Sequence, residues 1–235
     1  MKTRLLILTA AGSFTLGWLT VPHALPQQPV RFDHVVRNDF FAGFGGDAEA
    51  FQRGMKKTEE VLAQQPNHAE ALVWHGAGVF SQSGQAFQAG DVQKGIELWT
   101  KGLAEMDRAV ELAPDHVGVR IPRGAPLLTV SRFVPADRQK ELLTRAMADY
   151  EHVFKLQSSA GYLEKMGTHP KGELYMGLAD GYDRTGQKEK SAEMLKRVVA
   201  ELPGSVYAKR AQKWMETGQL APNERNCIGC HTAAQ

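Results

Sequence analysis

Residues 175–203 read YMGLADGYDRTGQKEKSAEMLKRVVAELP, and this stretch predicts the architecture of the chain. Large apolar residues and small residues recur at helical spacing on both sides of Gly186. Glycine readily adopts the left-handed backbone conformation that ends many helices. The stretch therefore predicts two helices joined by a turn at Gly186, with small residues where the helices approach closely and large residues filling the gaps between them.

The spacing of these residues resembles the tetratricopeptide repeat (TPR). Seven positions match the repeat pattern and keep roughly the required size class: Tyr175, Leu178, Ala179, Tyr182, Ser191, Leu195 and Pro203. The resemblance implies an all-α fold, in which residues 47–217 form a TPR-like array of helical hairpins. It also implies that the concave surface of the array binds a protein partner.

The second half of the pattern recurs upstream as a small residue followed four positions later by a larger one. The recurrences are Gly54 with Thr58, Gly102 with Met106, and Ala146 with Tyr150. The small residues of successive units are 48, 44 and 45 positions apart, against about 34 in the standard repeat. Longer helices or wider turns are therefore expected. Glycines in residues 81–95 predict a widened turn, and prolines in residues 120–135 argue against a regular helix there.

Helix boundaries are predicted from capping residues. Asn67 and Glu70 form a capping-box-like pair, and Asp91 is placed to cap the helix that follows it. Ser205 should begin a last helix that ends at Gly218. This helix would cover the apolar end of the array, as the end of a helical repeat requires.

Residues 1–24 have the features of a secretory signal peptide. Lys2 and Arg4 precede an uncharged, largely apolar run, and cleavage is expected after Ala24. The alternative is an uncleaved membrane anchor. Residues 25–46 form an N-terminal extension, whose phenylalanines and glycines would cap the first repeat, cover a haem or contact a partner. A periplasmic or otherwise extracytoplasmic location is expected, with membrane attachment only if the segment is uncleaved.

The charge balance argues against a nucleic-acid partner. Without its first 24 residues the chain has 26 basic and 26 acidic residues. Nucleic-acid binding usually requires a concentrated basic surface. No hydrolytic motif or phosphate-binding loop stands out either.

Residues 227–231 read CIGCH, the pattern of c-type haem attachment. Cys227 and Cys230, the only two cysteines, would each bond to one haem vinyl group, and His231 would bind the iron as the proximal ligand. Residues 218–235 are thus predicted to form a haem-binding segment with one covalent haem c. Alternatives for the cysteine pair are part of a zinc site, a redox pair or a disulfide.

Two residues are candidates for the second axial ligand of the haem iron. The segment resembles the haem-binding segments of the tetrahaem subunit of photosynthetic reaction centres, in which a methionine on a helix precedes the motif. Met215 lies 12 positions before Cys227, so the resemblance implies Met215 as a possible distal ligand. Core packing or a surface position are alternatives for Met215, and His34, in a loop-like stretch, is the alternative ligand. His68, His116 and His169 fall near predicted turns and are expected to be solvated.

These patterns predict an exported monohaem c-type cytochrome on a TPR scaffold. It would transfer one electron to or from a redox protein partner or complex subunit held by the TPR surface. The alternative is a periplasmic TPR adaptor or assembly protein with a structural or gas-sensing haem. A third hypothesis is a peroxidase-like enzyme with an open coordination site on the iron.

Overall fold

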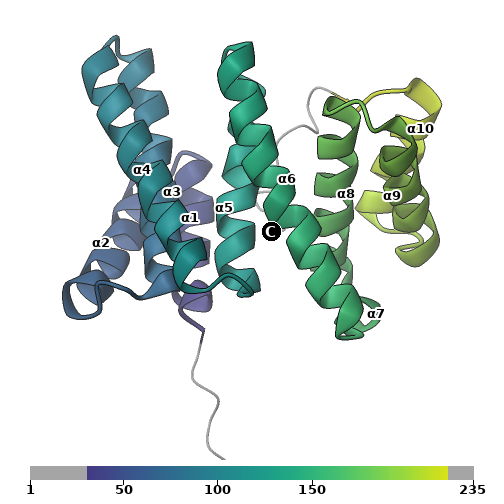
Figure 1. Ribbon diagram of the computed structural model, residues 1–235, viewed down its shortest axis with the longest axis horizontal. Helices are drawn as coiled ribbons and strands as arrows, with labels where there is room; N and C mark the ends of the chain where they lie inside the picture. Colours follow the sequence, from purple (N-terminus) through teal and green to yellow (C-terminus); the bar gives the residue numbers. More distant parts are fainter. Residues whose placement is uncertain (1–30, 222–235) are drawn as a thin grey trace, which may run out of the picture. The chain divides into compact units, whose positions relative to one another are not determined.

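The computed structural model describes residues 31–221, so the predicted signal peptide and the CIGCH motif lie outside the described residues. Within that range the chain forms ten α-helices and no strand (Figure 1), which confirms the all-α prediction. The helices are α1 (Phe32–Phe44), α2 (Ala48–Gln64), α3 (Ala69–Gln88), α4 (Val92–Leu112), α5 (Val117–Val130), α6 (Ala136–Ser159), α7 (Tyr162–Lys165), α8 (Thr168–Arg184), α9 (Lys188–Glu201) and α10 (Val206–Thr217).

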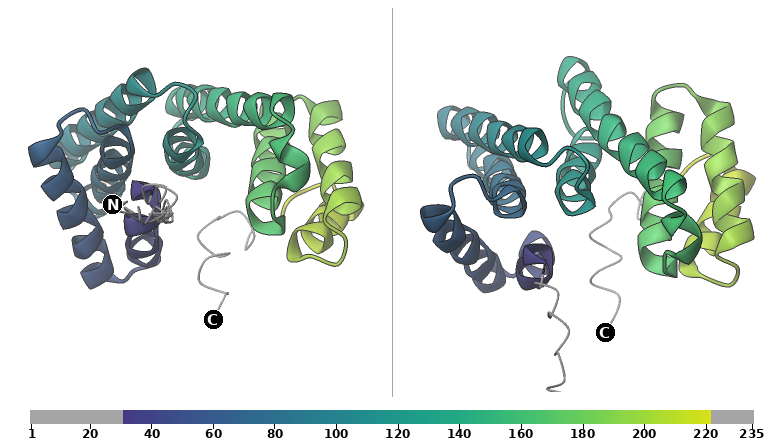
Figure 2. Two further views of the ribbon diagram at one scale, coloured as in Figure 1. Left: turned by 90° about the horizontal axis from the view of Figure 1, so that it is seen from below. Right: turned by 60° about the horizontal axis from the view of Figure 1, so that its bottom comes forward.

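Successive helices pack in pairs, which gives a helical-repeat-like arrangement (Figures 1 and 2). The pairs are α1 with α2, α3 with α4, α5 with α6, and α8 with α9, while α10 packs on α9. The first helices of neighbouring pairs also contact one another, α1 with α3, α3 with α5, and α5 with α8. Because each pair buries its apolar face against its neighbours, the core is continuous along the array.

The positions predicted from the repeated pattern are buried. The small residues are Gly54, Gly102, Ala146 and Ser191, and the larger ones are Thr58, Met106, Tyr150 and Leu195. At Gly102 a Cβ atom would lie 2.6 Å from the backbone nitrogen of Phe80 and 2.7 Å from the carbonyl oxygen of Gly76. The small residue is therefore what allows α3 and α4 to approach closely.

Most predicted boundaries are confirmed. Gly186 has a φ of 79° in the turn between α8 and α9, and Gly218 ends α10 with a φ of 73°. Asp91 accepts a hydrogen bond from the backbone nitrogen of Lys94 at 3.0 Å. Ser205 caps α10 in the same way, through Ala208.

Two predicted interruptions are wrong. The turn expected in residues 81–95 is not widened, because α3 continues to Gln88 and only three residues separate it from α4. Helix α5 also continues through Pro122 and Pro126. Each proline removes a helical hydrogen-bond donor. The burial of Val119 and Leu127 in the common core opposes that cost, and tertiary packing outweighs local propensity here.

The predicted pairing of Asn67 with Glu70 is also wrong. His68 caps α3, since its Nδ1 accepts a hydrogen bond from the backbone nitrogen of Ala71 at 3.2 Å. The Glu70 carboxylate instead accepts from the backbone nitrogens of Phe32 and Asp33, at 2.8 and 3.3 Å. These are orphan donors at the start of α1, so Glu70 fixes α1 to α3.

Candidate functional site

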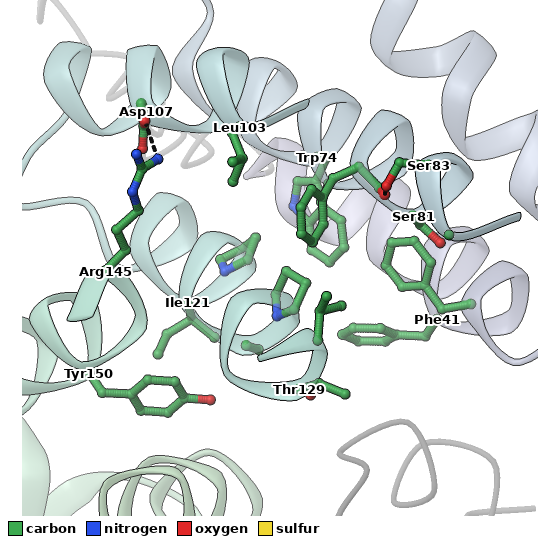
Figure 3. Close-up of a pocket in the computed structure, with 18 of the residues that line it drawn as sticks. Phe41, Trp74, Ser81, Ser83, Leu103, Asp107, Ile121, Thr129, Arg145 and Tyr150 are labelled. Carbon is green, nitrogen blue, oxygen red and sulfur yellow. Dashed lines mark hydrogen bonds and ion pairs between the residues drawn. The ribbon is translucent and has the colours of Figure 1, made fainter. Parts of the chain in front are cut away.

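A groove of about 1380 Å³ is lined by residues of α1, α3, α4, α5, α6 and α8 (Figure 3). Its volume exceeds the roughly 300–1000 Å³ typical of small-molecule pockets. Much of the lining is aromatic or aliphatic, including Phe41, Trp74, Leu103, Ile121 and Leu174. The groove can therefore bury a large, mainly apolar group.

Helix α5 supplies a central part of this lining. Pro122 and Pro126 both line the groove, together with Ile121, Ala125 and Val130 of the same helix. Each proline contributes an apolar ring to this lining, although it also removes a helical hydrogen-bond donor.

An ionic network fixes the wall formed by α4, α5 and α6. Arg145 donates to Asp107 at 2.7 Å (Figure 3), and Arg123 donates to both Asp107 and the fully buried Asp149. Burial disfavours the charged form of Arg123, but its hydrogen bonds and charge attraction to the two aspartates outweigh burial and raise its pKa. These ion pairs join α4, α5 and α6, and Asp107 and Arg145 also line the groove.

A second network crosses α8 and α10. The Nδ1 atom of His169 lies 2.7 Å from the Tyr207 hydroxyl, and this hydroxyl donates to Glu173 Oε1 at 2.7 Å. The network therefore joins the first turn of α8 to the first turn of α10. His169 and Glu173 both line the groove.

The structure places two of the predicted site residues. Met215 lies on α10 and is 43% exposed, so the alternative that it packs in the core is wrong. His34 lies on α1 rather than in a loop, and its Nε2 is 3.7 Å from an Asp33 carboxylate oxygen. Neither residue lines the groove. Cys227, Cys230 and His231 lie outside the described residues.

The groove itself was not predicted from sequence, because its lining comes from six separate helices. His169 was expected only as a solvated histidine near a turn; it is indeed exposed, but it lies in the first turn of α8 and lines the groove. Among residues 31–221 no cluster of three or more histidine, cysteine, aspartate or glutamate residues is arranged to hold a metal ion. In the same range no helix is long and apolar enough to cross a membrane.

Comparison of the chain with protein-family models, with curated proteins and with solved structures finds no match.

Proposed function

We propose that this protein is an exported monohaem c-type cytochrome on a TPR-like scaffold, which exchanges one electron with a protein partner. The observation that carries the proposal is the motif from Cys227 to His231. Cys227 and Cys230 would hold the haem covalently, and His231 would bind its iron. The bound haem supplies a one-electron centre, whose potential depends on its axial ligands and on its burial.

The helical pairs support the TPR-like part of the proposal. In the 175–203 stretch, Tyr175, Leu178 and Ala179 are all buried, and the Ser191 hydroxyl donates to the Ala179 carbonyl at 2.8 Å across the α8–α9 turn. Contacts between the first helices of neighbouring pairs are those expected of stacked repeats.

Exposed apolar residues support a protein partner. Phe133 is 73% exposed, Ile96 51% and Phe87 39%, and all three line the groove. Exposed aromatic and aliphatic side chains that belong to one surface often mark an interaction site. A redox partner would bury these side chains when it docks.

An optical redox titration of the purified full chain, made in a host that attaches c-type haem, tests the proposal. We expect one reversible transition that involves a single electron. The matched control is a Cys227→Ser, Cys230→Ser double variant, which should be purified without haem. A haem that cannot be reduced and reoxidised reversibly, or that binds carbon monoxide rapidly when reduced, would favour the adaptor or gas-sensing alternative.

A further inference from the structure

We propose that the groove is a binding site for an uncharged quinone with an apolar tail. The inference goes beyond the proposed function, because it depends neither on the haem nor on the residues that would attach it. Four properties of the groove support it: the pairing of its charges, one indole N–H group, its aromatic walls and its size.

The charged side chains that line the groove already have partners. The pairs are Asp33 with Arg31 and Arg37, Asp107 with Arg145, Glu141 with Arg138 and Arg145, and Glu173 and His169 with Tyr207. A charged ligand would have to break one of these pairs or remain unpaired in a largely apolar groove, and both are costly. The pairing therefore favours a ligand without a net charge.

Trp74 supplies a hydrogen-bond donor to this lining. Trp74 lines the groove from α3 and is 3% exposed, and its indole N–H group has no hydrogen-bond partner among residues 31–221. The indole ring stacks on Phe40 at 5.3 Å, and Phe41 lies edge-on to it at 5.7 Å. A buried donor without a partner destabilises the protein, and a ligand oxygen would relieve that cost. Because the N–H group is shielded from water, a small shift of the lining must accompany this contact.

The walls of the groove suit a flat ring. Trp74 faces α5, on which Ile121 and Thr129 lie (Figure 3). A second aromatic pair in the lining is Phe80 with Trp99, whose ring centres are 4.6 Å apart. Aromatic side chains pack favourably on other planar rings, either offset or edge to face. A quinone combines such a ring with two carbonyl acceptors at its edge and no charge.

The groove is larger than a single ring requires. Its volume of about 1380 Å³ exceeds that of typical small-molecule pockets. The apolar lining also includes the exposed Phe87 and Ile96, close to the turn between α3 and α4. An apolar tail would fill this space and would remove apolar surface from water. The outer faces of Phe87 and Ile96 stay available to a protein partner.

Equilibrium dialysis of the purified full chain tests the proposal with three probes that share a decyl tail. Decylubiquinone is the neutral quinone, decylbenzene has a ring without an acceptor, and 4-decylbenzoate carries a negative charge. We expect saturable binding of one decylubiquinone per chain, with a higher affinity than that of either other probe.

Trp74→Phe removes the N–H donor and keeps an aromatic ring against Phe40. Loss of one hydrogen bond should weaken the binding of decylubiquinone by about 3- to 10-fold. Decylbenzene cannot accept a hydrogen bond, so its affinity should change by less than about 2-fold. Because both probes are measured in the same variant, a general change in packing would affect both alike.

Ala125→Phe tests the location of the site. Ala125 lines the groove from α5, and the larger side chain should weaken the binding of decylubiquinone and decylbenzene by at least about 10-fold, because overpacking of the groove excludes the ring. Ala200→Phe, at an exposed position of α9 outside the groove lining, is the matched control and should bind both probes like the wild type. Circular dichroism checks that both variants keep the wild-type helix content.

The proposal is overturned if decylubiquinone does not bind saturably, or if 4-decylbenzoate binds more tightly than decylubiquinone. It is also overturned if Trp74→Phe weakens the binding of decylbenzene as much as that of decylubiquinone. Binding by the Cys227→Ser, Cys230→Ser variant alone would overturn it as well, since haem would then occupy the groove. The haem proposal is tested by haem content and not by quinone binding, so the two failures are distinguishable.

Discussion

Arg123 binds Asp149 through two parallel hydrogen bonds, from Nε to Oδ2 at 2.7 Å and from Nη2 to Oδ1 at 2.8 Å. The pair joins α5 to α6. Asp149 is fully buried, and Arg120 donates a further hydrogen bond to it at 2.8 Å. Removal of the carboxylate would leave Arg123 largely buried beside a neutral group.

We therefore expect Asp149→Asn to lower the free energy of unfolding by about 3–5 kcal/mol. Urea denaturation measures the change. Glu111→Gln is the control, because the ion pair of Glu111 with Arg108 is exposed and should contribute less than about 1 kcal/mol. Equal effects of the two substitutions would show that the buried pair does not stabilise the α5–α6 contact.

Gly102→Ala should weaken the contact between α3 and α4. The new methyl group would meet the backbone of Phe80 and Gly76, which cannot move without separating the helices. We expect a loss of about 1–3 kcal/mol, measured by thermal or urea unfolding. At Gly84, also in α3, a Cβ atom would meet nothing within 4 Å, so Gly84→Ala should stabilise the protein by about 0.5–1 kcal/mol. If Gly102→Ala were also stabilising, the close approach of α3 and α4 would be incorrect.

The free energy of unfolding should change at high pH because of Tyr175. Burial and its hydrogen bond to Glu201, 2.9 Å long, raise the pKa of Tyr175 from 10.0 to about 12. The folded protein therefore favours the neutral phenol of Tyr175. The stabilisation that results is fully present below pH 10 and is lost as the pH rises through about 12. The difference in unfolding free energy between the wild type and Tyr175→Phe should thus shrink across this window. Tyr162→Phe is the control, because Tyr162 is 60% exposed. A difference that does not depend on pH would contradict the raised pKa.

The local features of the fold could be predicted because their causes lie close together in the sequence. The turn at Gly186 and the caps at Asp91 and Ser205 each depend on residues within one helical turn. The spacing of small and large residues, such as Gly102 with Met106, reports helix pairing in the same way. From these signals the all-helical fold and the last helix could be predicted.

The remaining features depend on contacts between distant residues. The Glu70 carboxylate accepts a hydrogen bond from the start of α1, 38 positions earlier. The local capping pattern therefore predicted the wrong partner for Glu70. Pro122 and Pro126 remain helical because α5 is packed against its neighbours. His169 meets Tyr207 across 38 positions. A single-sequence pattern contains no signal for such a pairing, and none for a groove whose lining comes from six helices.

Covalent attachment of one haem through Cys227 and Cys230 can be tested by intact-mass measurement under denaturing conditions. The full chain should be made with a c-type haem maturation system, unfolded and extracted with acid–acetone before the measurement. We expect a mass equal to the chain plus one haem in the wild type, and the mass of the chain alone in the Cys227→Ser, Cys230→Ser variant. A wild-type mass without haem, with free haem in the extract or one zinc ion per native chain, would contradict it.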